Sequence, residues 1–336
     1  MPTDRSTPTP HDALFRAAFE HPAAAAGELV SVLPAPLAAV LDAASVHLES
    51  ASYIEPALGE RRSDLLFSAR FGEETALVYL LFEHQSTADA RMAFRMLAYL
   101  VRIWERWERE HDSPIPERAT WLPPIIPIIV SHARDGWTAP TELHAMVRPP
   151  PSAIDGLAPL VPSLRVLVDD LTRVTNEDLH ARALAPFPKI ALWLLRDGRD
   201  PDTLLRNLAT WANALHEVAS ATDGMRAMQL VLAYLNRVLE REHFDEFRDK
   251  MVELAPATEE PTMRYSDYMI EKGREQGIAL GRTEGQRATL VKQLTLKFGP
   301  LDGDTLARID AATPLELEHA LEKILSADAL AGVLTP

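Results

Sequence analysis

The chain has 336 residues, of which 47% are hydrophobic and 25% are charged, and these are the proportions of an ordinary globular protein. Its formal net charge is −15, so bulk attraction does not draw it to nucleic acid, and any contact with phosphates needs a local basic surface. It has no cysteine, which excludes disulfides, thiolate nucleophiles and sulfur-ligated zinc.

The sequence shows no segment suited to crossing a membrane. No apolar run reaches the roughly 18 residues that a membrane-spanning helix needs. Residues 1–12 also lack the apolar stretch of a secretion signal. We therefore expect a cytoplasmic protein without a membrane partner. Any metal must be held by oxygen or imidazole, and a carboxylate site would favour Mg²⁺ or Mn²⁺.

The first half of the chain predicts a mixed α/β core. Apolar residues recur at helical spacing after residue 11, and an alanine-rich stretch follows them. Ser86, Thr87 and Asp89 suit an N-cap region and precede a long amphipathic stretch near residue 90. In chain order the predicted elements are a helical region at 11–44, a strand at 46–54, two strands within 61–86 joined by a turn at 72–75, a helix at about 90–110, a strand at 125–130, a proline-rich loop at 138–163 and a strand at 163–171.

The second half predicts helices throughout. Residues 176–254 have a helical pattern, and residues 286–335 suit a compact helical cap. Between them, glycines recur every four residues at Gly273, Gly277, Gly281 and Gly285. On one helix they would form a slowly turning groove, and each costs about 0.5–1 kcal/mol against alanine. Close approach of a second helix, as in a homodimer through Gly273–Gly285, would offset that cost; the alternative is a flexible, charged connector.

We divide the chain into three predicted regions. Residues 1–175 form the α/β core, residues 176–260 form a helical region packed on that core, and residues 261–336 form the glycine-periodic helix with its helical cap. The expected fold class is therefore α/β, with a mixed sheet flanked by helices and an all-helical C-terminal region.

Two acidic residues enter the predicted hairpin. Asp64 lies near the start of its first strand, and Glu83 lies near the end of its second. If the turn is centred between Glu73 and Glu74, Asp64 lies directly opposite Glu83, with Cβ atoms about 4.5–5.5 Å apart on one face. Gln85 points to that same face. A slip of one residue would place the two acids on opposite faces, so the prediction depends on the register.

Neighbouring carboxylates raise each other's pKa, and a divalent cation removes that penalty. We therefore predict a metal site in which Asp64 and Glu83 are ligands and Gln85 orients a water or a phosphate oxygen. The alternative is an exposed ion pair of Asp64 with Arg61 or Arg62, with Glu83 and Gln85 as polar residues of an edge strand.

The helix after Gln85 carries a row of arginines on one side and apolar residues on the other. The row consists of Arg91, Arg95, Arg102 and Arg106, which fall within about 60° of one another on a helical wheel. We predict that Arg91, Arg95 and Arg102 bind DNA phosphates. The alternative is a solvated face, neutralised by acidic residues of the same helix at Glu105, Glu108 and Glu110.

Five segments carry a resemblance to a known family. In chain order they are HDALFRAAF, ERRSDLLFSAR, VYLLFEHQS, MLAYLVRIWE and PIIPIIVSH with the following GWTAP. Together they resemble the recombination-promoting nuclease, or putative transposase, family of the PD-(D/E)XK nuclease superfamily over about residues 8–200. The resemblance implies a restriction-endonuclease-like fold and magnesium-dependent endonucleolytic cleavage of DNA linked to recombination or transposition.

In the superfamily pattern an Asp begins the second strand and a (D/E)-x-K sequence ends the third. Asp64 and Glu83 match the two acids, and Gln85 falls on the lysine position, where it lacks the positive charge but can hold a water. Nucleases of this superfamily often use an acidic residue of the first helix, so Asp12 and the adjacent His11 are accessory candidates. Asp12 also suits a helix N-cap.

Two other functions remain open. A nuclease fold that has lost catalysis could act as a binding or scaffold module, which the acidic balance and Gln85 allow. A three-carboxylate strand-transfer enzyme of the RNase H type would need a third acid from a distant helix, for which the sequence offers no convincing candidate.

Overall fold

The computed structural model describes residues 9–49, 64–83, 89–110 and 121–333. The chain separates into two compact units, Met1–Thr262 and Met263–Pro336, and each is described by itself. In the described residues, no helix combines the length and the apolar character needed to span a membrane.

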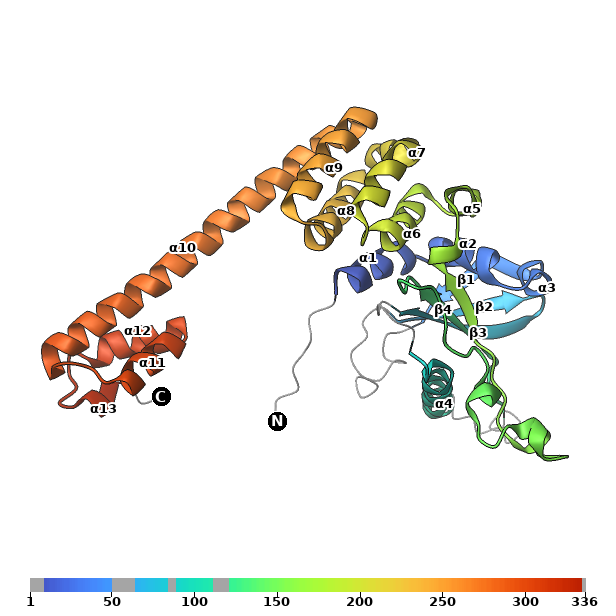
Figure 1. Cartoon of the computed structure of the whole chain (residues 1–336), viewed down its shortest axis with the longest axis horizontal. Helices are drawn as coiled ribbons and strands as arrows, with labels where there is room; N and C mark the ends of the chain where they lie inside the picture. Colours follow the sequence, from blue (N-terminus) through green and yellow to red (C-terminus); the bar gives the residue numbers. More distant parts are fainter. Residues whose placement is uncertain (1–8, 50–63, 84–88, 111–120, 334–336) are drawn as a thin grey trace. The chain divides into compact units, whose positions relative to one another are not determined.

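The first unit is built on a five-stranded mixed sheet whose spatial order is also the chain order (Figure 1). Each of the first two strands pairs antiparallel with the next, and the last two run parallel to the third. The mixed sheet followed by helices confirms the predicted fold class. The strands are β1 Leu41–Leu48, β2 Leu65–Phe71, β3 Glu74–Glu83, β4 Ile125–Ser131 and β5 Leu167–Asp170.

The first strand begins earlier than predicted. The helical region 11–44 ends with α3, and Leu41 already pairs with Phe71 of β2. Residues 41–44 contain good helix formers, but pairing with β2 overrides their weak local preference. The predicted strand at 46–54 was therefore misplaced, and its part from residue 50 onward lies outside the described residues. The helices before β1 are α1 Pro10–Phe19, α2 Pro22–Val32 and α3 Ala35–Ala38.

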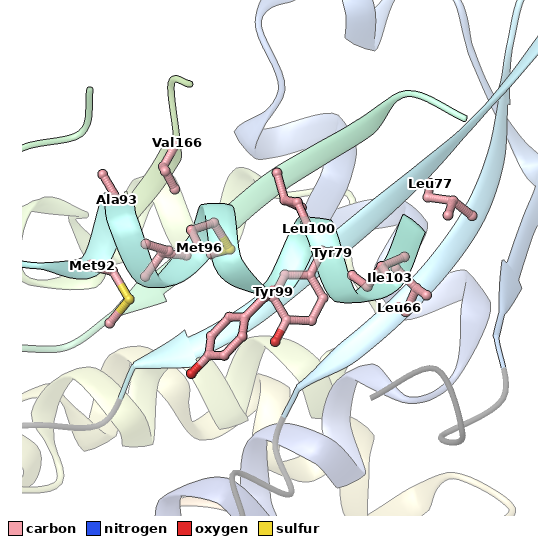
Figure 2. Packing of buried hydrophobic residues seen from close by; sticks show 11 residues of the cluster. Leu66, Leu77, Tyr79, Met92, Ala93, Met96, Tyr99, Leu100, Ile103 and Val166 are labelled. Atoms are coloured by element: carbon pink, nitrogen blue, oxygen red, sulfur yellow. The ribbon is translucent and has the colours of Figure 1, made fainter. Parts of the chain in front are cut away.

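Helix α4 (Met92–Glu110) covers one side of the sheet, close to its predicted position. Its apolar stripe packs on alternate residues of the strands, including Leu66, Tyr79 and Ile129 (Figure 2). The residues between them, such as Phe67 and Val78, are also buried and point to the opposite side. On that side α2 contacts β1 and β5, and α1 contacts helices that follow the sheet.

The connection between β4 and β5 contains short 3₁₀ turns, and helices follow β5. The 3₁₀ turns of the chain are η3 Leu143–Met146, η4 Pro151–Ala153, η5 Ala158–Leu160, η6 Leu171–Arg173 and η7 Pro256–Thr258. The helices are α5 Asn176–Ala181, α6 Pro186–Asp197, α7 Pro201–Ser220, α8 Gly224–Val238 and α9 Arg241–Leu254. Trp193 of α6 stacks on Trp211 of α7 with 5.3 Å between ring centroids. These helices confirm the pattern predicted for 176–254.

Helix α10 (Glu259–Phe298) runs through all four periodic glycines and ends before Gly299, whose φ of 89° suits only glycine. A Cβ added at Gly273, Gly277, Gly281 or Gly285 would meet no atom within 4 Å. The end of α10 packs with the last three helices around a core that includes Leu290, Leu294, Ile309 and Leu317. Those helices are α11 Gly303–Ala311, α12 Pro314–Lys323 and α13 Leu330–Val333.

Candidate active site

The candidate site lies where one strand starts and three others end. β2 runs antiparallel to β3, so residues at the start of β2 lie beside the end of β3. Glu83 pairs with Ser131 at the end of β4, and Ser131 pairs with Asp170 at the end of β5. Asp64 directly precedes the first residue of β2. The topology therefore gathers acidic positions from β2, β3 and β5 at one edge of the sheet.

The register of the β2–β3 hairpin differs from the predicted one. Phe71 pairs with Glu74 across a two-residue turn formed by Gly72 and Glu73. Gly72 adopts a φ of 66°, and a glycine with positive φ favours this short connection. The turn is thus centred one residue earlier than predicted.

The prediction that Asp64 lies directly opposite Glu83 was therefore wrong. Because Leu65 pairs with Leu80, continuing the ladder by one residue would place Asp64 opposite Leu81. Glu83 then lies two residues farther along β3. A shift of two residues, unlike a shift of one, preserves the phase of strand alternation, so the register still allows the two positions to act together.

Asp64 is buried, with 5% of its surface exposed. Its Oδ2 accepts a hydrogen bond from the hydroxyl of Tyr79 at 2.6 Å. This burial contradicts an exposed ion pair at Asp64, and Arg61 and Arg62 themselves lie outside the described residues. A carboxylate in such a position needs strong compensating interactions, as a cation or several donors can supply.

Glu83 is the last residue of β3, and its backbone pairs with Ser131. β3 lies between β2 and β4, so the alternative that placed Glu83 on an edge strand was wrong. Gln85 lies outside the described residues. The roles of Glu83 and Gln85 stay predictions.

The arginine row of α4 is partly engaged within its own helix and the residues just before it. Arg95 donates to Asp89 Oδ2 at 2.6 Å and to the hydroxyl of Tyr99 at 3.0 Å. Burial alone would lower the pKa of Arg95, but the hydrogen bonds to Asp89 and Tyr99 outweigh it and raise that pKa above its ordinary value. Arg91 is exposed and lies over the ring of Phe94, 5.3 Å from its centroid.

Farther along α4, Arg102 lies 3.8 Å from Glu105, and Arg106 lies 2.7 Å from Glu110. These contacts fit part of the alternative in which acidic neighbours neutralise the row. Exposed pairs of this kind contribute only about 0–1 kcal/mol, so they do not prevent the guanidinium groups from turning to a phosphate.

The accessory candidates of the first helix have local roles. Thr9, and not Asp12, is the N-cap of α1. Asp12 occupies the N3 position of a capping box, and its carboxylate accepts a hydrogen bond from the Thr9 hydroxyl at 2.8 Å. His11 Nδ1 lies 3.1 Å from the hydroxyl of Tyr234 in α8, and the His11 ring contacts that of His132. These contacts place His11 against the helical region, and a catalytic role for either residue stays a prediction.

Sequence reasoning missed Tyr79 and Tyr99 and named Asp89 only as part of an N-cap region. A signal existed for each tyrosine. Tyr79 carries a hydroxyl at a position where β3 is otherwise apolar, and a buried tyrosine hydroxyl usually finds a partner. Tyr99 follows Arg95 by four residues, the spacing at which helical side chains meet.

A second acidic cluster, also unforeseen, lies on the side of the sheet away from α4. Arg182 donates to both carboxylate oxygens of Glu28, at 2.8 and 2.9 Å, and to both of Asp169, at 2.8 Å each. Burial, and then the charge of Asp169, raise the pKa of Glu28 to about 8 despite the opposing effect of Arg182. We call these three residues the buried triad. Its contacts join α2 and β5 to the segment that follows α5.

The oxygen donors at the sheet edge suit a hard divalent cation. Asp64 supplies a carboxylate at the start of β2, and the buried residue Ser131 supplies a hydroxyl at the end of β4, on the other side of β3. Across the part of the chain that the structure describes, no group of three or more His, Asp or Glu side chains is arranged to hold a metal. The predicted site uses two carboxylates, and the described side chains include only Asp64 of that pair.

Comparison with known families identifies the class of protein. The family described as "Putative transposase, YhgA-like" matches residues 9–226, which include the whole sheet and helices α1–α7, and the chain belongs to this family. Among solved structures, none matches the chain.

Three curated relatives of Escherichia coli are similar to the chain. Recombination-promoting nuclease RpnD of strain O157:H7 is 38% identical over 130 residues, 39% of this chain, which spans about half (48%) of that relative. Recombination-promoting nuclease RpnA of strain K12 is 27% identical over 82% of this chain and 88% of its own length. The inactive recombination-promoting nuclease-like protein RpnE of strain K12 is 25% identical over 86% of this chain and 90% of its own length.

Proposed function

We propose that this chain is a magnesium-dependent DNA endonuclease of the cytoplasm, associated with recombination or transposition. The observation that carries the proposal is Asp64, a buried carboxylate at the start of β2, on the sheet edge where β3 ends in Glu83. Family membership and the similarity to nucleases RpnA and RpnD support it.

In this proposal Asp64 and Glu83 hold Mg²⁺ or Mn²⁺, and Gln85 positions the attacking water. The ion, when bound, stabilises charge on the phosphoryl group and makes water a better nucleophile. Arg91, Arg95 and Arg102 hold DNA phosphates along α4. Arg95 is the best oriented of the three, because Asp89 and Tyr99 fix its guanidinium group.

The test is Asp64→Asn, which keeps the size of the side chain and an acceptor oxygen for Tyr79. Several kcal/mol of charge stabilisation correspond to a loss of roughly 100-fold or more in rate. Nicking of supercoiled plasmid with and without Mg²⁺ measures the rate. Asp155→Asn, an exposed aspartate between η4 and η5, is the matched control and should nick like the wild type. Undiminished nicking by Asp64→Asn would reject the proposal.

A second candidate function is a catalytically inactive nuclease fold that acts as a binding or scaffold module. Similarity to inactive RpnE over most of the chain favours it, as does Gln85 at the lysine position of the superfamily pattern. Calorimetric titration with Mg²⁺ separates the two functions. A scaffold would bind DNA or a protein partner but show no heat of Mg²⁺ binding that depends on Asp64 and Glu83.

We also propose that the protein forms a homodimer in which α10 pairs with a second copy through Gly273–Gly285. Helix α10 carries the open space at each glycine that a second helix could enter. Exposed apolar residues on this stretch, Ile278 and Leu280, add to the surface that a second copy would cover. Analytical ultracentrifugation of the full chain measures the association state, and Gly277→Leu should shift it to monomer.

A further inference from the structure

The apolar cluster beneath α4 contains the hydroxyl of Tyr79 among hydrophobic neighbours. Tyr79 is 1% exposed and packs with Leu66, Leu77 and Ile129, all of which are hydrophobic. A phenylalanine would fill nearly the same space, so the hydroxyl is what distinguishes this position. That hydroxyl donates to Asp64 Oδ2 at 2.6 Å, the short distance typical of a hydrogen bond to a carboxylate.

The Tyr79 ring is held in place by a second tyrosine. The ring of Tyr99 meets it edge-on, with 5.9 Å between centroids and 72° between planes. Figure 2 shows the two rings side by side, one from β3 and one from α4, with both hydroxyls on the same side. Tyr99 in turn accepts a hydrogen bond from Arg95, which Asp89 holds at its other nitrogen.

This arrangement restricts the Tyr79 hydroxyl to a small volume. Closely packed aromatic rings in a protein interior do not shift without displacing their neighbours. The Tyr79 hydroxyl is therefore held beside the same oxygen of Asp64, Oδ2. A fixed donor on one oxygen fixes the plane of the carboxylate and hence the direction of its other oxygen.

We propose that Tyr79 is a positioning residue that orients Asp64 for a divalent cation, with Tyr99 holding the phenol ring in place. The inference rests on the proposed function, because it takes Asp64 as a ligand of the cation. Groups that orient a metal ligand typically change metal affinity by about 10–100-fold when they are removed. Tyr79→Phe removes the donor and keeps the ring.

The experiment is isothermal titration of the full chain, free of DNA, with Mn²⁺ and separately with Mg²⁺. Wild type, Tyr79→Phe, Asp64→Asn and Tyr99→Phe are compared. Tyr79→Phe is expected to bind at least about 10-fold more weakly than the wild type. Tyr99→Phe is the matched control: it also loses a buried hydroxyl from the cluster but keeps the ring contact with Tyr79, so its affinity should change less than about twofold.

A double-variant cycle separates positioning from a general effect on packing. If Tyr79 acts through Asp64, adding Tyr79→Phe to Asp64→Asn has no further effect on the residual affinity. Near-ultraviolet difference spectra give an independent signature. The cation should perturb tyrosine absorbance in the wild type, and that change should be absent in Tyr79→Phe. Thermal unfolding of each variant verifies that it is folded at the titration temperature.

The outcomes distinguish this inference from the proposed function. If Asp64→Asn abolishes binding while Tyr79→Phe binds like the wild type, the positioning role is overturned and the metal site stands. If Asp64→Asn binds as the wild type does, Asp64 is no ligand, and both ideas are overturned. Weaker binding by Tyr79→Phe, with Tyr99→Phe unchanged and no additivity with Asp64→Asn, supports the inference.

Discussion

Carboxylates are buried on both sides of the sheet, and the two sides compensate them differently. On the side away from α4, Glu28 and Asp169 share the guanidinium group of Arg182, and each carboxylate oxygen of the pair receives a hydrogen bond. On the α4 side, Asp64 Oδ2 accepts a hydrogen bond from the neutral phenol of Tyr79.

The comparison sets a structural role against the metal-binding role that we propose for Asp64. The buried triad contains the positive charge of Arg182 and fixes helix α2 against β5. The protein itself therefore supplies the counter-ion for its two acidic residues. The neutral hydroxyl of Tyr79 orients one oxygen of Asp64, the carboxylate that we propose as a cation ligand. Burial alone would not have distinguished the two groups, since both are less than one-tenth exposed.

The largest expected effect is that of Arg182→Ala. It would leave the buried carboxyl groups of Glu28 and Asp169 without their shared cation, and breaking such a cluster by removing one partner costs about 3–5 kcal/mol. Urea denaturation at pH 7 measures the free energy of unfolding. Arg173→Ala, which removes an exposed partner of Asp170, should cost less than about 1 kcal/mol. Equal effects of the two variants would show that the triad is not a structural centre.

The next effect concerns pH. Burial raises the pKa of Glu28 to about 8, so the folded state holds a proton that the unfolded state releases near its ordinary value of 4.5. The stability contributed by that proton is complete below about pH 4.5 and is lost as pH rises toward 8. Glu28→Gln should remove this loss.

Relative to the wild type, Glu28→Gln should therefore gain stability as the pH rises from 5 to 9, by on the order of 4 kcal/mol, because the pKa is raised from 4.5 to about 8 and a tenfold change in proton affinity is worth about 1.4 kcal/mol. Chemical denaturation of both proteins at each pH measures the difference, in which the other titrating groups cancel. A difference that stays constant with pH would mean that Glu28 is ionised in the folded protein throughout.

The smallest effect is that of Asp64→Asn on stability. Functional carboxylates are often not optimal for folding, and replacing them commonly raises stability by about 0.5–2 kcal/mol. Asparagine keeps an acceptor for Tyr79 and removes the cost of burying a charge, so we expect a gain of about 1 kcal/mol in metal-free buffer. A loss of more than about 2 kcal/mol would place Asp64 in the same structural class as the buried triad.

Much of the fold could be predicted from the sequence because its signals are local. The amphipathic stripe from Met92 to Ile103 specified α4, and the apolar run at 125–130 specified β4. The start of β1 could not be predicted in this way. Its residues favour a helix locally, and only the contact with β2, about 30 residues later in the chain, decides otherwise.

The positions of Asp64 at the start of β2 and of Glu83 at the end of β3 were predictable, whereas their register was not, and their role as metal ligands stays a prediction. The residue types and order around Asp64 and Glu83 indicated a paired acidic site, and family membership was confirmed. The offset of the pairing depended on Gly72, because a glycine at the first position of a two-residue turn shifts the pairing of the whole ladder by two residues. The hydrogen bond from the Tyr79 hydroxyl to Asp64 could not be predicted from sequence periodicity, because it depends on how the strands and α4 pack together.

The contact between Arg182 and Glu28 joins residues 154 positions apart. At a synthesis rate of about 5–20 residues per second, Glu28 leaves the ribosome's peptidyl-transferase centre roughly 8–30 s before Arg182 exists. During that interval the nascent N-terminal helices have no counter-ion from this residue. The sheet can pair strand by strand in chain order. The ion pairs of Arg182 with Glu28 and Asp169, on the side of the sheet away from α4, can form only after translation has passed β5. Pausing of translation before codon 182 should therefore prolong the time for which the growing chain depends on chaperones.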